Sequence, residues 1–339
     1  MKCIRTEDAV GHVLCHDMTQ IIPGVSKGPR FRKGHVVTEE DIPVLLSMGK
    51  ENLFVWEMEP GMVHENDAAE RLAALCGREN MTWSETKEGK IELKSAIEGV
   101  FLVDSARLFA VNSIDELMIA TRRGGGTVHP GDKLAGTRVI PLIIREEKLR
   151  QAEQAAGSAP LLSVRPFVRH TAAVITTGSE VAKGRIPDSF TPVVERKLAA
   201  FGIRMTEHIL VEDGQENVLE AIEQMKRRPV DMILCTGGMS VDPDDSTPGA
   251  IKASGADIVT YGAPVLPGAM FLLGYYGDGR PVMGLPGCVM YAKATIFDLV
   301  LPRIAADVRL EKRDFVAFGE GGLCLGCESC TYPHCGFGR

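Results

Sequence analysis

The stretch that decides the fold is V-D-M-I-L-C-T-G-G-M-S-V-D-P-D-D-S-T-P, residues 230–248. It begins with a short apolar run, residues 232–235, that ends in a glycine turn. Such a run predicts a strand covered on both faces of its sheet. Gly237 and Gly238 let the backbone turn tightly and approach a ligand, because glycine has no Cβ. Thr247 followed by Pro248 predicts a helix start, with a cap residue before a proline.

Three carboxylates lie in the loop between these glycines and the helix start, namely Asp242, Asp244 and Asp245. The strand, the glycine turn, the acidic loop and the helix together predict a binding edge. The alternative is an ordinary connection with solvated aspartates, since loops at strand ends are commonly polar.

Strands and helices alternate through the second half of the chain. Apolar runs predict strands at 172–176, 203–211, 232–235 and 281–285, and helical spacing predicts helices at 191–201, 215–228, 247–254 and 290–305. This alternation predicts an α/β fold of three layers, with a mostly parallel sheet between helices on both faces. Ligands of such sheets bind beyond the carboxyl ends of the strands, so the loops 177–189, 237–247 and 286–288 should converge on one crevice.

A smaller α+β region is expected before this domain. We predict a β-rich module over 1–60 and a small α+β module with a connector helix over 61–155. The α/β domain then spans 165–308, and a cysteine-rich, metal-binding tail spans 320–339. Within the small module we expect strands at 100–103, 108–111 and 139–144 and a helix at 114–120.

Composition limits the class of protein. A chain of 339 residues allows two or three domains. The net charge of -7 and the pI of 5.7 argue against a nucleic-acid binder, which would present a basic face. The first residues have no apolar signal region, and no apolar run approaches the ~18 residues of a membrane span. We therefore expect a cytoplasmic homo-oligomer that binds neither nucleic acid nor membrane.

The loop T-T-G-S-E-V-A-K-G-R-I-P-D-S, residues 176–189, carries chemistry suited to a phosphate. Backbone amides at the glycine turn and at the next helix start favour an anion, and Lys183 or Arg185 could add a charge-assisted contact. Carboxylates at the same crevice would repel the phosphate unless a cation such as Mg²⁺ lay between them. Neither G-x-G-x-x-G nor G-x-x-x-x-G-K occurs, so a generic nucleotide-binding protein is the weaker hypothesis.

Several motifs in order carry a family resemblance: T-T-G-S-E at 176–180, D-S at 188–189, G-G-M-S-V-D-P-D-D at 237–245, L-P-G-A-M at 266–270 and G-L-P-G at 284–287. They resemble the molybdopterin-binding domain shared by molybdopterin adenylyltransferase and molybdopterin molybdenumtransferase. The resemblance covers about 171–305 and is closer to the molybdenumtransferase.

The resemblance implies a ligand, a metal and a reaction. The ligand would be molybdopterin, as its phosphate or its adenylate, and molybdate would be inserted with loss of AMP. The acidic site would comprise Glu180, Asp213 and Asp245, with Glu180 and Asp245 holding Mg²⁺. A metal there would neutralise charge developing on the leaving phosphate. Together with the loop positions, the resemblance assigns cofactor contacts to Thr177, Gly178, Ser179, Lys183, Asp188, Ser189, Gly237, Gly238, Met239, Ser240, Asp242, Pro286 and Gly287.

The sequence also departs from the molybdenumtransferase pattern. Ser179 replaces an acid, Asp242 replaces a glycine, and Cys288 stands where the family has asparagine. The first 160 residues match the transferase only loosely, and its C-terminal β-barrel domain has no counterpart in the sequence. These departures favour pterin binding over the insertion reaction. The alternative function is a non-catalytic carrier, sensor or regulatory protein that contacts a molybdoenzyme or another cofactor-assembly protein.

Four of the nine cysteines crowd into the tail as Cys324-x2-Cys327-x2-Cys330-x4-Cys335. This spacing predicts that the chain wraps one metal centre, and both an Fe–S cluster and a Zn²⁺ site remain open. A redox-active or disordered tail is the alternative. The other five cysteines are scattered and are expected to be reduced and buried.

Overall fold

The computed structural model describes residues 2–22, 26–55, 60–185, 187–240 and 245–338. The chain divides into two compact units. Unit 1 comprises Met1–Ala96, Val103–Arg122 and Pro130–Ser163, and unit 2 comprises Ile97–Leu102, Arg123–His129 and Val164–Arg339. Within the described ranges, every helix is too short or too polar to cross a bilayer.

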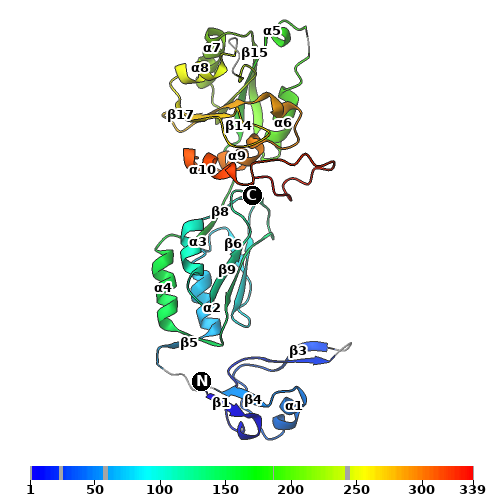
Figure 1. Cartoon of the computed structure of the whole chain (residues 1–339), viewed down its shortest axis with the longest axis vertical. Helices are drawn as coiled ribbons and strands as arrows, with labels where there is room; N and C mark the ends of the chain where they lie inside the picture. The colour runs from blue at the N-terminus through cyan, green and yellow to red at the C-terminus, as the bar shows by residue number, and fades with distance from the viewer. Residues whose placement is uncertain (1, 23–25, 56–59, 186, 241–244, 339) are drawn as a thin grey trace. The chain divides into compact units, whose positions relative to one another are not determined.

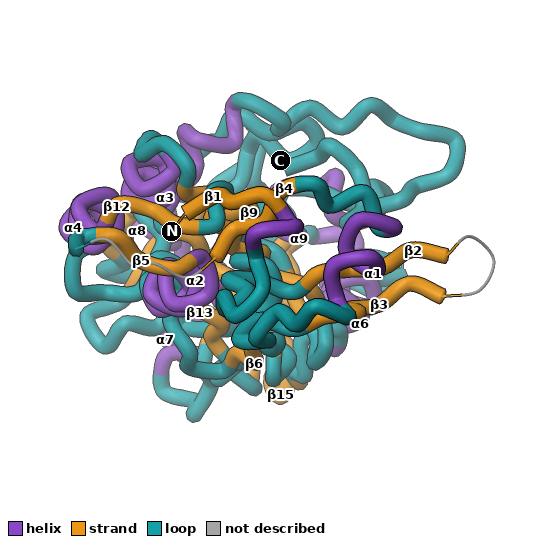
Figure 2. The backbone as a smooth tube through the Cα atoms, turned by 90° about the horizontal axis from the view of Figure 1, so that it is seen from below, coloured by secondary structure: helices purple, strands orange, loops and turns teal. Residues whose placement is uncertain are grey.

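Unit 1 opens with two small antiparallel pairs of strands. β1 (Lys2–Arg5) pairs with β4 (Asn52–Val55), and β2 (Met18–Ile22) pairs with β3 (Ser26–Phe31), as Figure 2 shows. The short helix α1 (Asp41–Ser47) contributes Leu45 to a buried apolar cluster that also contains Leu14 and Leu53.

A four-stranded antiparallel sheet forms the rest of unit 1. Its order is β6-β7-β11-β9, with bounds Met81–Trp83, Lys90–Ser95, Lys133–Val139 and Leu117–Thr121. Helix α2 (Glu65–Ala74) packs on this sheet, and helices α3 (Ser105–Asn112) and α4 (Glu146–Ala156) pack against each other. A separate pair joins β5 (Met62–His64) to β12 (Ile143–Arg145).

Two predictions for unit 1 are wrong. The run 108–111, predicted as a strand, lies in α3, because the Asp104 side chain caps a helix start by accepting the Arg107 amide. Phe109 is 76% exposed there, so its apolar character does not indicate burial. The segment 114–120, predicted as a helix, contains β9, in which buried Leu117 and Ile119 alternate with outward-facing residues.

Unit 2 is built on a six-stranded sheet in the order β15-β14-β16-β19-β18-β17. β14, β15, β16 and β19 run parallel, and β18 and β17 continue the sheet through two antiparallel pairings. The predicted mostly parallel sheet is therefore confirmed. The strand bounds are Arg204–Val211 for β15, Thr171–Thr177 for β14, Met232–Thr236 for β16, Pro281–Leu285 for β19, Leu272–Tyr275 for β18 and Asp257–Tyr261 for β17.

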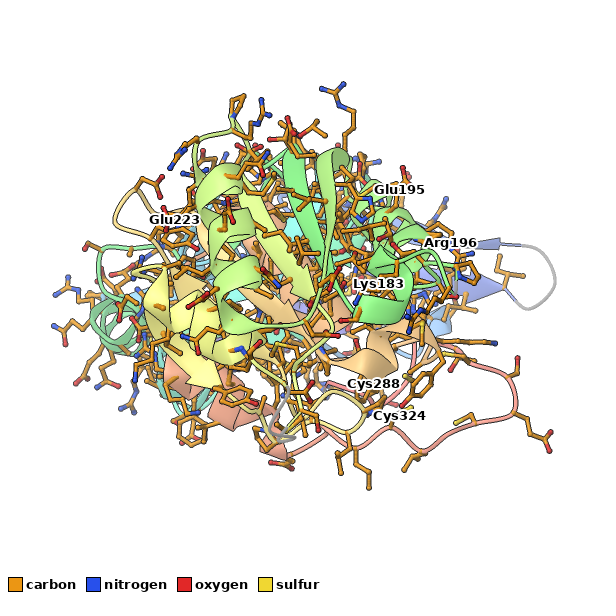
Figure 3. The ribbon with its side chains drawn as sticks, turned by 90° about the horizontal axis from the view of Figure 1, so that it is seen from above. Lys183, Glu195, Arg196, Glu223, Cys288 and Cys324 are labelled. Atoms are coloured by element: carbon orange, nitrogen blue, oxygen red, sulfur yellow. The ribbon has the colours of Figure 1, made fainter. Side chains whose placement is uncertain are left out.

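Helices cover both faces of this sheet, which confirms the three-layer α/β fold (Figure 1). Along β14, Ala172 and Val174 enter the cluster formed with α6 (Thr191–Ala199) and α9 (Ile296–Ala305). Ala173 and Ile175 point to the opposite side, as successive strand residues do, and pack with α7 (Gln215–Lys226) and α8 (Thr247–Ala253). Arg196 on α6 and Glu223 on α7 mark the two sides of the sheet in Figure 3.

The prediction failed at three places in unit 2. The strands β17 and β18 were not predicted. Helix α9 begins at Ile296 rather than at residue 290, because Thr295 and Asp298 form a capping box there, and a 3₁₀ turn occupies Gly287–Met290. The remaining elements are β8 (Gly99–Val103), β10 (Thr127–Val128), β13 (Leu162–Arg165), α5 (Ser179–Ala182), α10 (Lys312–Val316) and the 3₁₀ turns Thr6–Asp8 and Ala317–Gly319.

The cysteine-rich tail packs on unit 2 up to residue 338. Phe337 is 5% exposed within the cluster on the α9 side, and the Tyr332 hydroxyl donates to the Asp298 carbonyl at 3.0 Å. The Gly338 amide donates to the Gly321 carbonyl at 2.8 Å and closes the tail into a loop. The alternative of a disordered tail is therefore not what the structure has.

Candidate functional site

Four strands of unit 2 end side by side at one edge of the sheet, which we call the carboxyl edge. Thr177, the last residue of β14, pairs with Val211 at the end of β15. Thr176 pairs with Thr236 at the end of β16, and Thr236 pairs with Leu285 at the end of β19. The loops that carry the predicted site residues therefore leave the sheet at neighbouring positions.

Asp213, one of the three predicted acidic residues, holds the first two loops of this edge together. Its carboxylate accepts the Ser179 amide at 2.8 Å and the Thr177 hydroxyl at 3.3 Å. The Asp213 amide in turn donates to the Ser179 hydroxyl at 3.3 Å. Burial alone would raise the pKa of Asp213, but these hydrogen bonds outweigh it and hold that pKa below its ordinary value. The carboxylate is therefore charged and already engaged.

Asp188 has a similar role at the start of α6. Its carboxylate accepts the amides of Phe190 at 2.8 Å and Thr191 at 3.0 Å, and it also accepts the Thr191 hydroxyl. Burial alone would raise the pKa of Asp188, but the hydrogen bonds from Thr191 and Phe190 lower it below its ordinary value. The Asp188 carboxylate thus fixes the start of α6, and both of its oxygens accept hydrogen bonds there.

Buried hydroxyls connect this cap to the sheet. The Thr191 hydroxyl lies 3.0 Å from that of Thr176, and the Thr236 hydroxyl donates to Thr176 at 3.2 Å. The His208 Nε2 atom contacts the hydroxyls of both Thr176 and Thr191, at 3.2 and 3.1 Å. The sequence analysis did not predict a role for His208, because its partners Thr176 and Thr191 lie far from it in the chain.

The two glycines of the deciding stretch are required by close packing. Gly237 has φ +86°, and a Cβ there would lie 2.3 Å from the Thr177 carbonyl oxygen. Gly238 has φ +56°, and a Cβ there would lie 2.8 Å from the Thr247 hydroxyl. That hydroxyl donates to the Gly237 carbonyl at 2.9 Å. The glycine turn thus joins the end of β14 to the start of α8.

Asp245 and Tyr261 meet beside this turn. An Asp245 oxygen lies 3.7 Å from the Cβ position of Gly238. The Tyr261 hydroxyl donates to the Met239 carbonyl at 3.1 Å, and burial together with the charge of Asp245 raises the pKa of Tyr261. Two antiparallel pairings restore the strand direction in β17, so Tyr261 at its end reaches the carboxyl edge.

Tyr261 is a residue that the sequence prediction missed. Tyr261 is 44% exposed. It pairs with Leu272 of β18, and Leu272 pairs with Gly284 of β19, so Tyr261 and Gly284 lie at the same height along the sheet. The missing signal was the strand pair β17 and β18, which had not been predicted.

The other residues predicted to contact the cofactor differ in their exposure and in their partners. Lys183 is exposed and forms an ion pair with Glu212 at 3.0 Å. Met239 is 4% exposed and packs against Gly284, where a Cβ would lie 2.5 Å from its sulfur. Pro286 precedes the 3₁₀ turn that begins at Gly287. Gly178 caps α5, and Ser189 and Ser240 are exposed in loops. Asp242 and the Glu180 side chain lie outside the described part of the chain.

The described residues do not form a preassembled magnesium site. Across the ranges that the structure describes, no three carboxylate, histidine or cysteine side chains are grouped as metal ligands. The Asp213 carboxylate instead accepts hydrogen bonds from the Ser179 amide and the Thr177 hydroxyl.

The same holds for the four tail cysteines, which are all described. Cys327 and Cys330 are exposed, whereas Cys324 and Cys335 pack partly buried against the cluster on the α9 side. Among the described residues of the tail, these thiols are not grouped as ligands of one metal. The contacts that hold the tail against unit 2 include the buried Phe337 ring and the Tyr332 hydroxyl.

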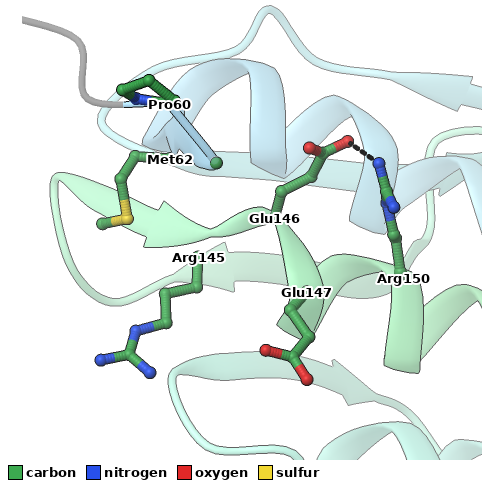
Figure 4. Close-up of a pocket in the computed structure, with 7 residues that line it drawn as sticks. Pro60, Met62, Arg145, Glu146, Glu147 and Arg150 are labelled. Carbon is green, nitrogen blue, oxygen red and sulfur yellow. Dashed lines mark hydrogen bonds and ion pairs between the residues drawn. The ribbon is translucent and has the colours of Figure 1, made fainter.

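A hollow of about 420 Å³ in unit 1 is lined by charged side chains (Figure 4). Arg150 donates to Glu146 at 3.2 Å, and Arg71 lies 3.6 Å from the same carboxylate. These are ion pairs along and between helices, which stabilise an exposed surface modestly. The hollow carries none of the predicted site residues.

Two family models match parts of the chain. Residues 173–306 match a family model described as "Probable molybdopterin binding domain", and residues 3–57 match a domain of unknown function. The segment that carries the carboxyl edge thus matches the molybdopterin-binding domain family, as its motifs predicted. A closer likeness to the molybdenumtransferase does not follow from these matches.

Curated relatives and solved structures show partial similarity. Proteins described as competence-damage inducible, from Bacillus cereus and Bacillus anthracis, are 33% identical over 90 residues, which is 26% of this chain and 22% of theirs. The chain therefore spans about a fifth of the length of these relatives. The structure of CinA from Thermoplasma acidophilum is 20% identical and covers 40% of this chain and 98% of its own, with a TM-score of 0.35. The molybdopterin biosynthesis enzyme MoaB from Thermus thermophilus is 17% identical over 42% of this chain and 98% of its own, with a TM-score of 0.33.

Proposed function

We propose that unit 2 binds molybdopterin, as its phosphate or its adenylate, at the carboxyl edge of its sheet. The observation that carries this proposal is the glycine turn at Gly237 and Gly238, which joins two strand ends and a helix start within the segment that matches the molybdopterin-binding model. Glycine turns and helix starts present backbone amides, which favour a phosphate group.

The polar groups of this edge divide between positioning and binding. Asp213 and Asp188 use their oxygens to fix the loops and are negatively charged, so they order the site without contacting an anion. Lys183 is exposed, and its ion pair with Glu212 at 3.0 Å lies at the surface, so it is able to turn toward a phosphate.

Tyr261 would supply the contact for the ring system of the ligand. Its hydroxyl is anchored on the Met239 carbonyl, which limits the rotation of the exposed ring. Planar heterocycles stack on aromatic faces of this kind, at a gain of roughly 0.5–1.5 kcal/mol beyond area burial. Lys183 and Tyr261 would thus hold opposite ends of a phosphorylated pterin.

Insertion of molybdate, with Mg²⁺ and loss of AMP, is the catalytic extension of this proposal. It would need a cation near Asp245 and Glu180, and the described donors do not provide that centre by themselves. Binding without turnover, as in a carrier or sensor, is the alternative function. Incubation of the protein with adenylated molybdopterin, Mg²⁺ and molybdate distinguishes the enzyme from the carrier, because only the enzyme would release AMP.

The binding proposal is tested by charge reversal. Lys183→Glu is expected to weaken the binding of anaerobically prepared molybdopterin, because the charge near the phosphate changes by two units. Lys252→Glu is the matched control, since Lys252 is exposed in the last turn of α8, away from the carboxyl edge. Isothermal titration calorimetry measures both. Equal affinities for the two variants, or no binding by the unaltered protein, would contradict the proposal.

A further inference from the structure

Arg303, in the last turn of α9, is a largely buried cation whose Nε atom has no hydrogen-bond partner among the described residues. Its side chain is 19% exposed, and its Nε atom is buried with no acceptor in reach. Its one ion pair within the described chain is with Asp314, whose Oδ1 lies 3.9 Å from Nη1. A guanidinium has five N–H donors, and buried donors are nearly always satisfied by protein, water or a bound ion.

The surrounding residues hold this guanidinium in place. Gly125 has φ +90°, and a Cβ there would lie 2.3 Å from the Arg303 Nη2 atom. The glycine turn is fixed by two hydrogen bonds with Phe101, one from the Gly125 amide at 2.6 Å and one to the Gly126 carbonyl at 3.0 Å. On another side, the Phe318 ring centre lies 5.4 Å from the guanidinium carbon. The glycine triplet therefore gives space to Arg303.

Asp314, at 3.9 Å, is a distant counter-charge for Arg303. Burial lowers the pKa of Arg303 below its ordinary value; Asp314 raises this pKa, and the positive charge of Arg123 lowers it further. Arg123 directly precedes the glycine turn 124–126, whose Gly125 packs against the Arg303 guanidinium, so an exposed second cation lies next to the first. Burial of charge is unfavourable unless a counter-charge and hydrogen bonds accompany it.

This cluster is separate from the carboxyl edge. Helix α9 runs back along the sheet after β19, and the Ala305 carbonyl near its end accepts the amides of Val168 and Arg169 at 2.8 and 3.0 Å. These residues precede β14, so Arg303 lies toward the amino end of the strands. None of the residues assigned to pterin binding belongs to the cluster.

We propose that Arg303 and Arg123 form a binding site for an oxyanion of the phosphate class, seated over the glycine turn 124–126. The planar guanidinium of Arg303 offers two parallel N–H groups, which match the oxygens of a phosphate. Arg123 adds a second cation from the exposed side, through which the anion enters. The ligand is inorganic phosphate or the phosphate group of a small ester.

The test is isothermal titration calorimetry of the full chain with inorganic phosphate, at an ionic strength held constant with sodium chloride. Arg123→Ala and Arg303→Met are each expected to weaken phosphate binding by about tenfold or more. Lys252→Ala, at an exposed position in the last turn of α8, is the control and should leave this affinity unchanged, whereas Lys183→Ala reports separately on phosphate that binds at the carboxyl edge. Because Arg123 is exposed, Arg123→Ala keeps the test decisive if Arg303→Met fails to fold.

Two results would overturn the proposal. One is an unaltered protein that binds phosphate no better than chloride. The other is phosphate binding that survives Arg123→Ala and is lost in Lys183→Ala, which would assign the anion to the carboxyl edge. Repeating the titration with glycerol phosphate distinguishes the two ligands, because tighter binding of glycerol phosphate would assign the site to an ester and tighter binding of inorganic phosphate would assign it to the free ion.

Discussion

Gly237→Ala is the substitution that tests the packing of the carboxyl edge most severely. The new Cβ would lie 2.3 Å from the Thr177 carbonyl oxygen and 2.9 Å from its Cγ2 atom, at a φ of +86°. The left-handed backbone costs an alanine about 1–2 kcal/mol. Overpacking against the fixed end of β14 adds about 1–3 kcal/mol. The expected loss of unfolding free energy is therefore about 2–5 kcal/mol.

Gly287→Ala is the matched control for this substitution. Gly287 lies beyond the end of β19 at the same edge, has no atom within 4 Å of its Cβ position and needs no positive φ. Urea unfolding followed by far-UV circular dichroism compares the two variants. Both tryptophans, Trp56 and Trp83, precede residue 97, so tryptophan fluorescence follows unit 1 and should change little. Variants that unfold within about 0.5 kcal/mol of each other would refute this account of the turn.

Three further predictions concern other parts of the chain. Burial lowers the pKa of His64 below 6.5, so the unfolded chain binds this proton more tightly, and the stability of unit 1, measured by tryptophan fluorescence, should fall as pH drops below about 6.5. Asp231→Asn should lower unfolding free energy by about 1–3 kcal/mol, because the Asp231 carboxylate accepts both the amide and the hydroxyl of Thr171; an unchanged urea midpoint would contradict this. Tyr332→Phe removes the bond to the Asp298 carbonyl and should speed tryptic cleavage of the tail, observed by mass spectrometry, whereas cleavage at the original rate would show that the tail is held without it.

The core of unit 2 was predictable because its apolar runs are strong local signals. The run 232–235 is β16, and each of its residues is buried. The turn at Gly237 and the helix start at Thr247 follow from local backbone chemistry, and both occur where they were expected. The segments 108–111 and 114–120 in unit 1 were assigned the wrong way round, since runs of four to seven apolar residues suit a helix or a strand equally.

The candidate site was predictable as a set of loops but not as a set of roles. Asp213 and Thr177 were both expected at the site, yet only the structure reveals that they bind each other. Tyr261 and His208 reach the edge through pairings between distant strands, which no spacing in the sequence records. The tail shows the same limit, because its cysteine spacing predicts a metal centre while its packing depends on Phe337 and Tyr332.

The central claim, that unit 2 binds molybdopterin at the carboxyl edge, is tested most directly by mass spectrometry. The full chain and its Tyr261→Leu variant would be purified anaerobically, incubated with molybdopterin and freed of unbound ligand. We expect one retained pterin per chain in the unaltered protein and much less in the variant, with Phe109→Leu, an exposed aromatic position in unit 1, as the control. Absence of retained pterin in the unaltered protein would contradict the claim, and equal retention in all three would contradict the role of Tyr261 alone.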